Sequence, residues 1–299
     1  MNKKSLSFVL TDIVYLFMTI VPFLFAMILK ILTNAPSSGV DITGADVYFT
    51  IPMPIQNLPV TESQVNSLCV LIAIAGLCLF LTHGITKGTL MTRHHIAEWI
   101  VEKVQTIVIK NMGEYFRFFT PFIIAILALS GFSSLIALLG LYAPTSDINI
   151  VGGWALVSFA VITYYKSVCG PVQYIKSFGD PVPFLAPLNI ISEIATPIAM
   201  AFRHYGNVLS GAVISVLVAT GLQGLSSMIF KFLPGFLGGI PFLQIGIPAI
   251  LSIYFDIFSG CLQAYIFAML TMLYVAGGFP ADLYEQKQKN KKKKLIGGN

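Results

Sequence analysis

Charge is what this 299-residue chain has least of. Charged residues make up 10% of it and hydrophobic residues 56%, whereas a soluble domain carries about 25% charged residues. So little charge excludes a soluble protein held by a single membrane anchor. We expect an all-α polytopic membrane protein with about six membrane helices, the last two long and tilted, and one further amphipathic helix at the surface.

Motifs for metals, disulfides and nucleotides are also missing from the sequence. The four cysteines all fall in apolar stretches, and they form no CxxC pair and no Cys/His cluster. This pattern indicates neither a zinc site nor a disulfide framework. The chain has no P-loop and no GxGxxG, so we expect no cofactor, no metal and no ATP-hydrolysing site of its own.

Six apolar stretches are long enough for the roughly 20 residues that one membrane crossing requires. They lie at about 8–32, 65–83, 119–142, 152–170, 186–230 and 242–279. The last two exceed one perpendicular crossing, so they must tilt, break or do both. The first begins after MNKK, which resembles the basic start of a signal peptide. Because the apolar run is long and no clear small-x-small cleavage site follows, we interpret it as a retained span, with cleavage as the alternative.

The distribution of basic residues predicts the topology. Lysine and arginine cluster at the N-terminus, in 87–117, at 166–176 and in the tail, and six spans place all four clusters on one side. The positive-inside rule makes that side the cytoplasm, with both termini in it. We expect four units, which are an extra N-terminal membrane helix (1–33), an external loop (34–64), a core (65–280) and a basic cytoplasmic tail (281–299). The tail fits contact with anionic lipid better than nucleic-acid binding.

The segment between the second and third spans predicts the surface helix. Its apolar residues recur at helical spacing at Ile96, Ile100, Val104, Ile107 and Val108, and the other side carries Glu98, Glu102 and Lys103. Such an amphipathic helix lies on a membrane surface.

Four charges interrupt the hundred residues between Asp180 and Asp282, and Arg203 is the most informative of them. It stands in ATPIAMAFRHYGNVLSGAVISVLVA, where no neighbour in the sequence can neutralise it. An arginine at the bilayer centre costs roughly 2.5–3.5 kcal/mol on insertion scales, so such a residue marks an ion or substrate pathway by default.

Polar residues share the face of Arg203. Asn207 and Ser210 follow it at i+4 and i+7, and Gly206 and Gly211 lie beside them. A helix-packing seam would account for the small and amide side chains. It does not account for an arginine without a partner.

Two carboxylates lie on either side of Arg203 in depth. Glu193 precedes it by ten residues, which is about 15 Å toward the inside. In the last span Asp256 and Gln263 are seven residues apart, so they share one face of the helix. If Gln263 is level with Arg203, Asp256 lies toward the outside. The order acid, arginine, acid predicts two water-filled half-pathways separated by a fixed positive charge. The alternative is that Asp256 pairs with Arg203.

These residues resemble subunit a of the F-type ATP synthases, over about residues 45–279. PLNIISEIATPIAMAFRHYGNVLSGAVI is similar to that family's Glu, Pro and R-x-x-G-N-x-x-x-G pattern. DIFSGCLQAYIFAMLT is similar to its acid seven residues before the Gln of LQA. APTSDIN and VTESQVNSL resemble two further motifs of the family. The chain departs from the family at Ala137, where Asn is frequent, at Ala212, where Glu or His is frequent, and at His204, where many relatives have Leu. We interpret His204 as a packing or lipid-boundary residue.

The resemblance implies a stator subunit in a bacterial plasma membrane. Two half-channels would carry protons to and from the carboxylates of the c-ring, separated by Arg203, with Gly206 and Gly211 packed close to the ring. The pathway residues would be Glu193, Asp256, Gln263, Asn207 and Ser210. The last two helices would pack against the ring, and the partners would be c-ring subunits, peripheral-stalk subunit b, the other ATP synthase subunits and lipid, but not nucleic acid. ATP would be made in partner subunits, and the choice between H⁺ and Na⁺ would rest largely on the ring.

Two other classes of function stay open at this stage. A secondary transporter in which Arg203 binds an anionic solute would show inverted repeats, and the sequence shows no convincing repeat. A structural assembly subunit would tolerate replacement of Arg203 without loss of ion flux.

Overall fold

The computed structural model describes residues 3–33, 44–54, 57–85, 92–168, 174–176, 178–179, 183–229, 250–251 and 253–279. Nearly all of them are helical. The longer helices are α1 (Lys3–Thr33), α2 (Glu62–Thr82), α3 (Thr92–Met112), α4 (Thr120–Leu135), α5 (Ile148–Ser167), α7 (Ala186–Ile229) and α9 (Gly260–Gly278). Short helical turns are η2 (Glu114–Phe119), η3 (Ile136–Leu139), η4 (Pro144–Ser146), η5 (Pro183–Leu185) and the π-helix η9 (Ile253–Ser259).

Six helical stretches of the described chain are long and apolar enough to cross a membrane, which confirms the predicted number of spans. They are Ser7–Thr33, Glu62–Thr82, Glu114–Leu139, Ile148–Ser167, Pro183–Ser226 and Ile253–Gly278. The second, third and fourth begin three to five residues before the predicted positions, because polar residues and short 3-10 turns lead into them.

The predicted external loop contains a β-hairpin that its polar composition did not indicate. Strand β1 (Val47–Ile51) pairs antiparallel with β2 (Leu58–Thr61), with Val47 opposite Thr61. The sequence VYFTI is made of aromatic and β-branched residues, which favour a strand. Residues 34–43, 55 and 56 of this loop lie outside the described chain.

Helix α1 lies antiparallel beside α2 and is held to its neighbours near both ends. At one end Asp12 accepts from His83 Nδ1 at 2.7 Å and pairs with Arg93 at 2.9 Å. At the other end Lys30 pairs with the buried carboxylate of Glu62 at 3.2 Å. Between them the helices approach so closely that a Cβ on Gly76 would lie 2.8 Å from that of Met18.

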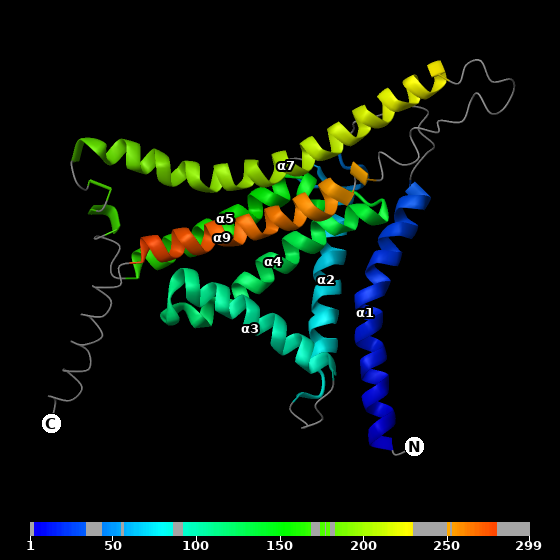
Figure 1. The fold of residues 1–299 in the computed structure, drawn as a ribbon, viewed down its shortest axis with the longest axis horizontal. Helices are drawn as coiled ribbons and strands as arrows, with labels where there is room; N and C mark the ends of the chain where they lie inside the picture. The colour runs from blue at the N-terminus through cyan, green and yellow to red at the C-terminus, as the bar shows by residue number, and fades with distance from the viewer. Residues whose placement is uncertain are drawn as a thin grey trace, which may run out of the picture.

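Helices α5, α7 and α9 run crosswise to α1 and α2 (Figure 1). Helix α7 continues through Pro197 for 44 residues, a length of about 66 Å. The last span instead begins with the π-helix η9 before α9 continues it. Helix α9 is the centre of the packing, because its buried residues contact α3, α4, α5 and α7. The long segments predicted to tilt or break therefore lie across the molecule, and the last one changes its helical type.

Helix α3 exists as predicted, and the C-terminal part of its predicted apolar stripe faces the core. Val108 is buried, and Val104 and Ile107 pack against the same cluster. Ile96 and Ile100 are exposed instead, whereas His94 and Met112 are buried. The packed face therefore includes a histidine that a stripe of aliphatic residues does not indicate.

Candidate functional site

Arg203 lies on α7 with an exposed side chain. It makes no ion pair and no hydrogen bond with any other residue that the structure describes. In particular, Asp256 does not pair with it, so the alternative of a structural Arg203–Asp256 pair is not realised. An arginine in an apolar helix with no partner among the described residues is suited to a partner from another molecule.

Two contacts fix the register between α7 and the last span. Asn207 Nδ2 donates to Ser259 Oγ at 2.8 Å, and a Cβ on Gly211 would lie 2.9 Å from Cδ1 of Phe255. A step of four residues toward the C-terminus of α7 therefore corresponds to a step of four residues toward the N-terminus of the last span. One further step of four places Arg203 level with Gln263, which is buried.

The same register puts Asp256 level with Ser210, on the predicted outer side of Arg203. Asp256 is half-buried within η9, and π-helical turns are frequent at functional sites. Ser210 is exposed and donates to the carbonyl of Asn207 at 3.1 Å. Asp256, Ser210 and Asn207 therefore lie within two turns of each other, on the side of Arg203 that the sequence predicts to face outward.

The two glycines beside Arg203 have different surroundings. The space at Gly211 is taken by Phe255 of the same chain, so this glycine serves the approach of α7 to η9. At Gly206 a Cβ would meet nothing within 4 Å. Only the second position leaves room for another molecule, and close packing against a ring stays a prediction there.

Glu193 has hydrogen-bond partners that the sequence does not predict. Lys166 Nζ on α5 donates to both carboxylate oxygens, at 2.8 and 2.9 Å, and the Tyr174 hydroxyl donates at 3.1 Å. Burial, together with the charge of Glu193 and the hydrogen bond to it, raises the pKa of Tyr174 to about 12. The phenol therefore keeps its proton. The sequence indicates Lys166 only as a topology signal, because a separation of 27 residues from Glu193 hides their contact.

His204 is fully buried on the side of α7 away from Arg203. Its Nε2 lies 3.3 Å from Ser130 Oγ, and its ring meets Trp154 and Phe267 edge-on at 6.1 and 5.8 Å between centroids. These contacts bear out the packing interpretation of His204 and exclude a position at the lipid boundary.

Two of the sequence motifs, VTESQVNSL and APTSDIN, meet where α2 and α5 begin. Ser63 donates to Asp147 at 2.5 Å, and the buried Glu62 accepts from the backbone N–H of Tyr142 at 3.0 Å. Asp147 also caps α5 by accepting from the N–H of Asn149 at 2.9 Å. The polar residues of the two motifs thus join α2 to the start of α5.

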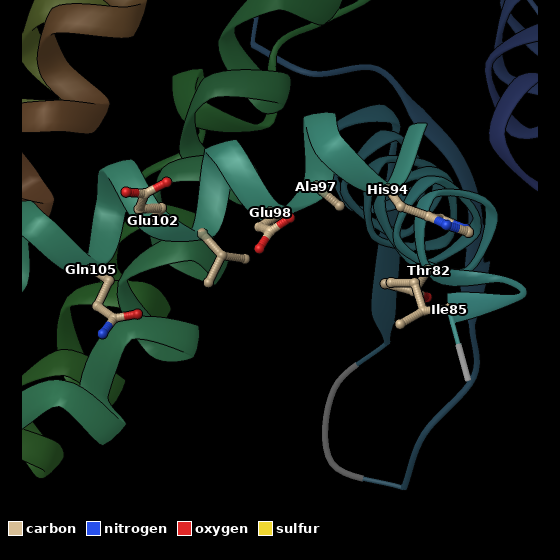
Figure 2. A pocket seen from close by; sticks show the side chains of 8 residues that line it. Thr82, Ile85, His94, Ala97, Glu98, Glu102 and Gln105 are labelled. Carbon is tan, nitrogen blue, oxygen red and sulfur yellow. The ribbon is translucent and has the colours of Figure 1, made fainter. Parts of the chain in front are cut away.

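A separate cavity of about 600 Å³ lies between the end of α2 and α3 (Figure 2). Thr82 and Ile85 line one side, and Glu98, Glu102 and Gln105 of α3 line the other. None of the predicted site residues borders it. Within the described chain, His, Cys, Asp and Glu form no group of three that could hold a metal ion.

The fold and the intramembrane charges define a class, which is a multi-pass helical membrane protein with isolated ionisable residues inside its spans. The family model of the ATP synthase A chain matches residues 65–276. The chain therefore belongs to the ATP synthase A chain family.

Curated relatives agree with this assignment. ATP synthase subunit a of Legionella pneumophila is 28% identical over 229 residues, which cover 76% of this chain and 90% of the relative. ATP synthase subunit a of Alkalihalophilus pseudofirmus is 32% identical over 197 residues, 60% of this chain and 75% of the relative. ATP synthase subunit a, sodium ion specific, of Propionigenium modestum is 32% identical over 138 residues, 46% of this chain and 40% of the relative.

Proposed function

We propose that this chain is the proton-translocating stator subunit of a bacterial F-type ATP synthase, with two half-channels separated by Arg203. The observation that carries the proposal is the register between α7 and the last span. It sets Arg203 level with Gln263 and Asp256 level with Ser210. Glu193 lies ten residues before Arg203 on α7, in the opposite direction, which supports one carboxylate on each side of the arginine. Family membership favours this function over a solute transporter or a purely structural subunit.

The face of α7 around Arg203 supports docking of a ring of c-subunits. Phe202 and Leu217 are 61% and 60% exposed, and Gly206 has open space. A membrane helix with an arginine amid exposed apolar residues fits a partner that is itself apolar and carries a carboxylate. The peripheral-stalk subunit b and the other ATP synthase subunits would contact the chain elsewhere.

The chemistry follows from the charge of Arg203. Its guanidinium stays protonated under all conditions and presents several donors in a fixed plane. A ring carboxyl group that arrives beside it is favoured as the anion, so it releases its proton. Glu193 passes that proton to the inside, and Asp256 supplies the next one from the outside. A membrane potential contributes about 2.3 kcal/mol per charge for each 100 mV.

The test separates the two sides of the membrane. The assembled complex is reconstituted in vesicles, an imposed potential drives proton flux, and the pH is varied on one side at a time. Glu193→Gln is expected to slow exchange with the inside, and Asp256→Asn exchange with the outside. We expect about tenfold or more in each case, since a positioned proton-transfer group contributes roughly 10²–10⁴-fold.

Sodium-free buffer serves as the control for the identity of the ion. Should both variants retain wild-type flux with either side varied, the two carboxylates would not belong to the pathway, and the half-channel proposal would fail.

A further inference from the structure

Three separate segments of the chain meet where Lys166 contacts Glu193, the inner carboxylate of the proposed pathway. Lys166 lies at the end of α5, Glu193 near the start of α7, and Gly278 at the end of α9. The ammonium donates to both oxygens of Glu193, and both side chains are about four-fifths buried. This is a two-point contact from a shielded cation rather than a solvated surface pair.

The aliphatic part of the Lys166 side chain packs directly on Gly278, which has no side chain to displace it. A Cβ on Gly278 would lie 2.5 Å from both Cγ and Cε of Lys166 and 3.0 Å from Cδ. The lysine therefore lies across the glycine, and any larger residue would push its stem away. Neighbouring Gly277 shows no such contact, because a Cβ there would meet nothing within 4 Å.

Tyr174 completes the set of donors to Glu193. Its hydroxyl donates at 3.1 Å. Within the described chain, Lys166 and Tyr174 are the charged or titratable side chains that contact Glu193. The carboxylate thus faces three hydrogen bonds, and one of its partners carries a positive charge.

We propose that Lys166, lying across Gly278, is a positioning residue of the inner half-channel that holds the carboxylate of Glu193 in one orientation. This inference rests on the proposed function, because it assigns Lys166 a task only if Glu193 carries protons. The proton that moves leaves the ring carboxyl group, resides on Glu193 and passes to water on the inner side.

The expected consequence is a change in pH dependence rather than a simple loss of activity. A nearby cation favours the ionised carboxylate. The Lys166→Gln substitution removes this cation from beside the carboxylate. When ATP hydrolysis drives pumping, protons enter from the inner side, so uptake would continue at a pH where the wild-type complex has begun to fail.

The experiment measures ATP-driven proton pumping by the whole complex in inverted vesicles, with the pH of the medium varied. The pumping rate is divided by the rate of uncoupled ATP hydrolysis at each pH. Lys166→Gln is expected to move the alkaline midpoint up by about one unit or more, the range in which an adjacent cation acts on a carboxylate. Lys166→Arg should restore most of the wild-type profile, because it keeps the charge.

The two glycines give a matched pair if Lys166→Gln fails to assemble. Gly278→Ala displaces the lysine stem and should shift the midpoint in the same direction, whereas Gly277→Ala should leave the profile unchanged. Superimposable profiles for wild type, Lys166→Gln and Gly278→Ala would overturn the role of Lys166, even if Glu193→Gln still slows pumping. An unaffected Glu193→Gln variant would instead count against the proposed function itself.

Discussion

At the residue scale, Asp256 is the acid that we propose for the outer half-channel. The family that this sequence resembles often has Glu or His one residue after the second glycine, where this chain has Ala212. Position 212 directly follows Gly211 on α7, and Gly211 packs on Phe255, the residue before Asp256.

This placement predicts a rescue. Asp256→Asn alone should reduce proton uptake from the outside by about tenfold or more, in keeping with the loss of a positioned proton-transfer group. Ala212→Glu in the same chain should restore part of that flux, because it returns a carboxylate to the same level of the pathway. The measurement is flux into reconstituted vesicles under an imposed potential. If the double variant is as slow as Asp256→Asn, positions 212 and 256 do not share a cavity.

Some site residues could be predicted from the sequence and others could not. Arg203, Glu193 and Asp256 stand out because a charge in an apolar run is costly and therefore conspicuous. Lys166 and Gly278 carry no such signal, since one lies at a span end where lysine is common and the other is a glycine among many. Their contact depends on three helix ends meeting, which the spacing of residues does not encode.

At the element scale, α1 is joined to the rest of the chain by charges at both ends. Asp12 contacts His83 and Arg93, and Lys30 contacts Glu62. These bonds favour a helix that remains part of the mature protein rather than a segment that is removed. Cleavage would leave the buried carboxylate of Glu62 without its cation.

The pair of Lys30 and Glu62 gives a test of that attachment. Removing one partner of a fully buried pair costs roughly 3–5 kcal/mol. Since the Lys30 side chain is 27% exposed, we expect about 1–3 kcal/mol for Lys30→Ala, with recovery in Lys30→Met combined with Glu62→Gln. The measurement is the thermal stability of the purified complex.

The exposed pair of Glu114 and Arg117, with side chains 70% and 66% exposed, is the control. Glu114→Gln should change stability by less than about 1 kcal/mol. Equal effects for Lys30→Ala and Glu114→Gln would mean that α1 is not held by this pair.

Helix existence was more predictable than helix orientation. The spacing of apolar residues predicts α3, yet only the C-terminal part of the predicted stripe packs against the core, and His94 is buried as well. The length of α7 predicts a tilted or broken helix, and the structure resolves that choice in favour of a continuous one through Pro197. Tertiary packing decides both outcomes, and a single sequence contains little information about it.

At the scale of the whole molecule, composition and charge distribution predict six spans, and the structure confirms them. The crosswise arrangement of α5, α7 and α9 relative to α1 and α2 (Figure 1) was not predictable. It results from side-chain contacts between distant segments, such as Asn207 with Ser259. That arrangement leaves one face of α7 open, with Arg203 on it.

Arg203 is proposed to separate two half-channels in the assembled complex. The most direct measurement compares proton flux with ATP synthesis in vesicles that contain wild-type, Arg203→Lys or Arg203→Ala complex, under one imposed potential. We predict that Arg203→Ala abolishes ATP synthesis while protons pass without it, because the fixed charge between the half-channels is gone. Arg203→Lys should keep the barrier but synthesise ATP more slowly, since a lysine lacks the planar set of donors. ATP synthesis at the wild-type rate in Arg203→Ala would contradict the account.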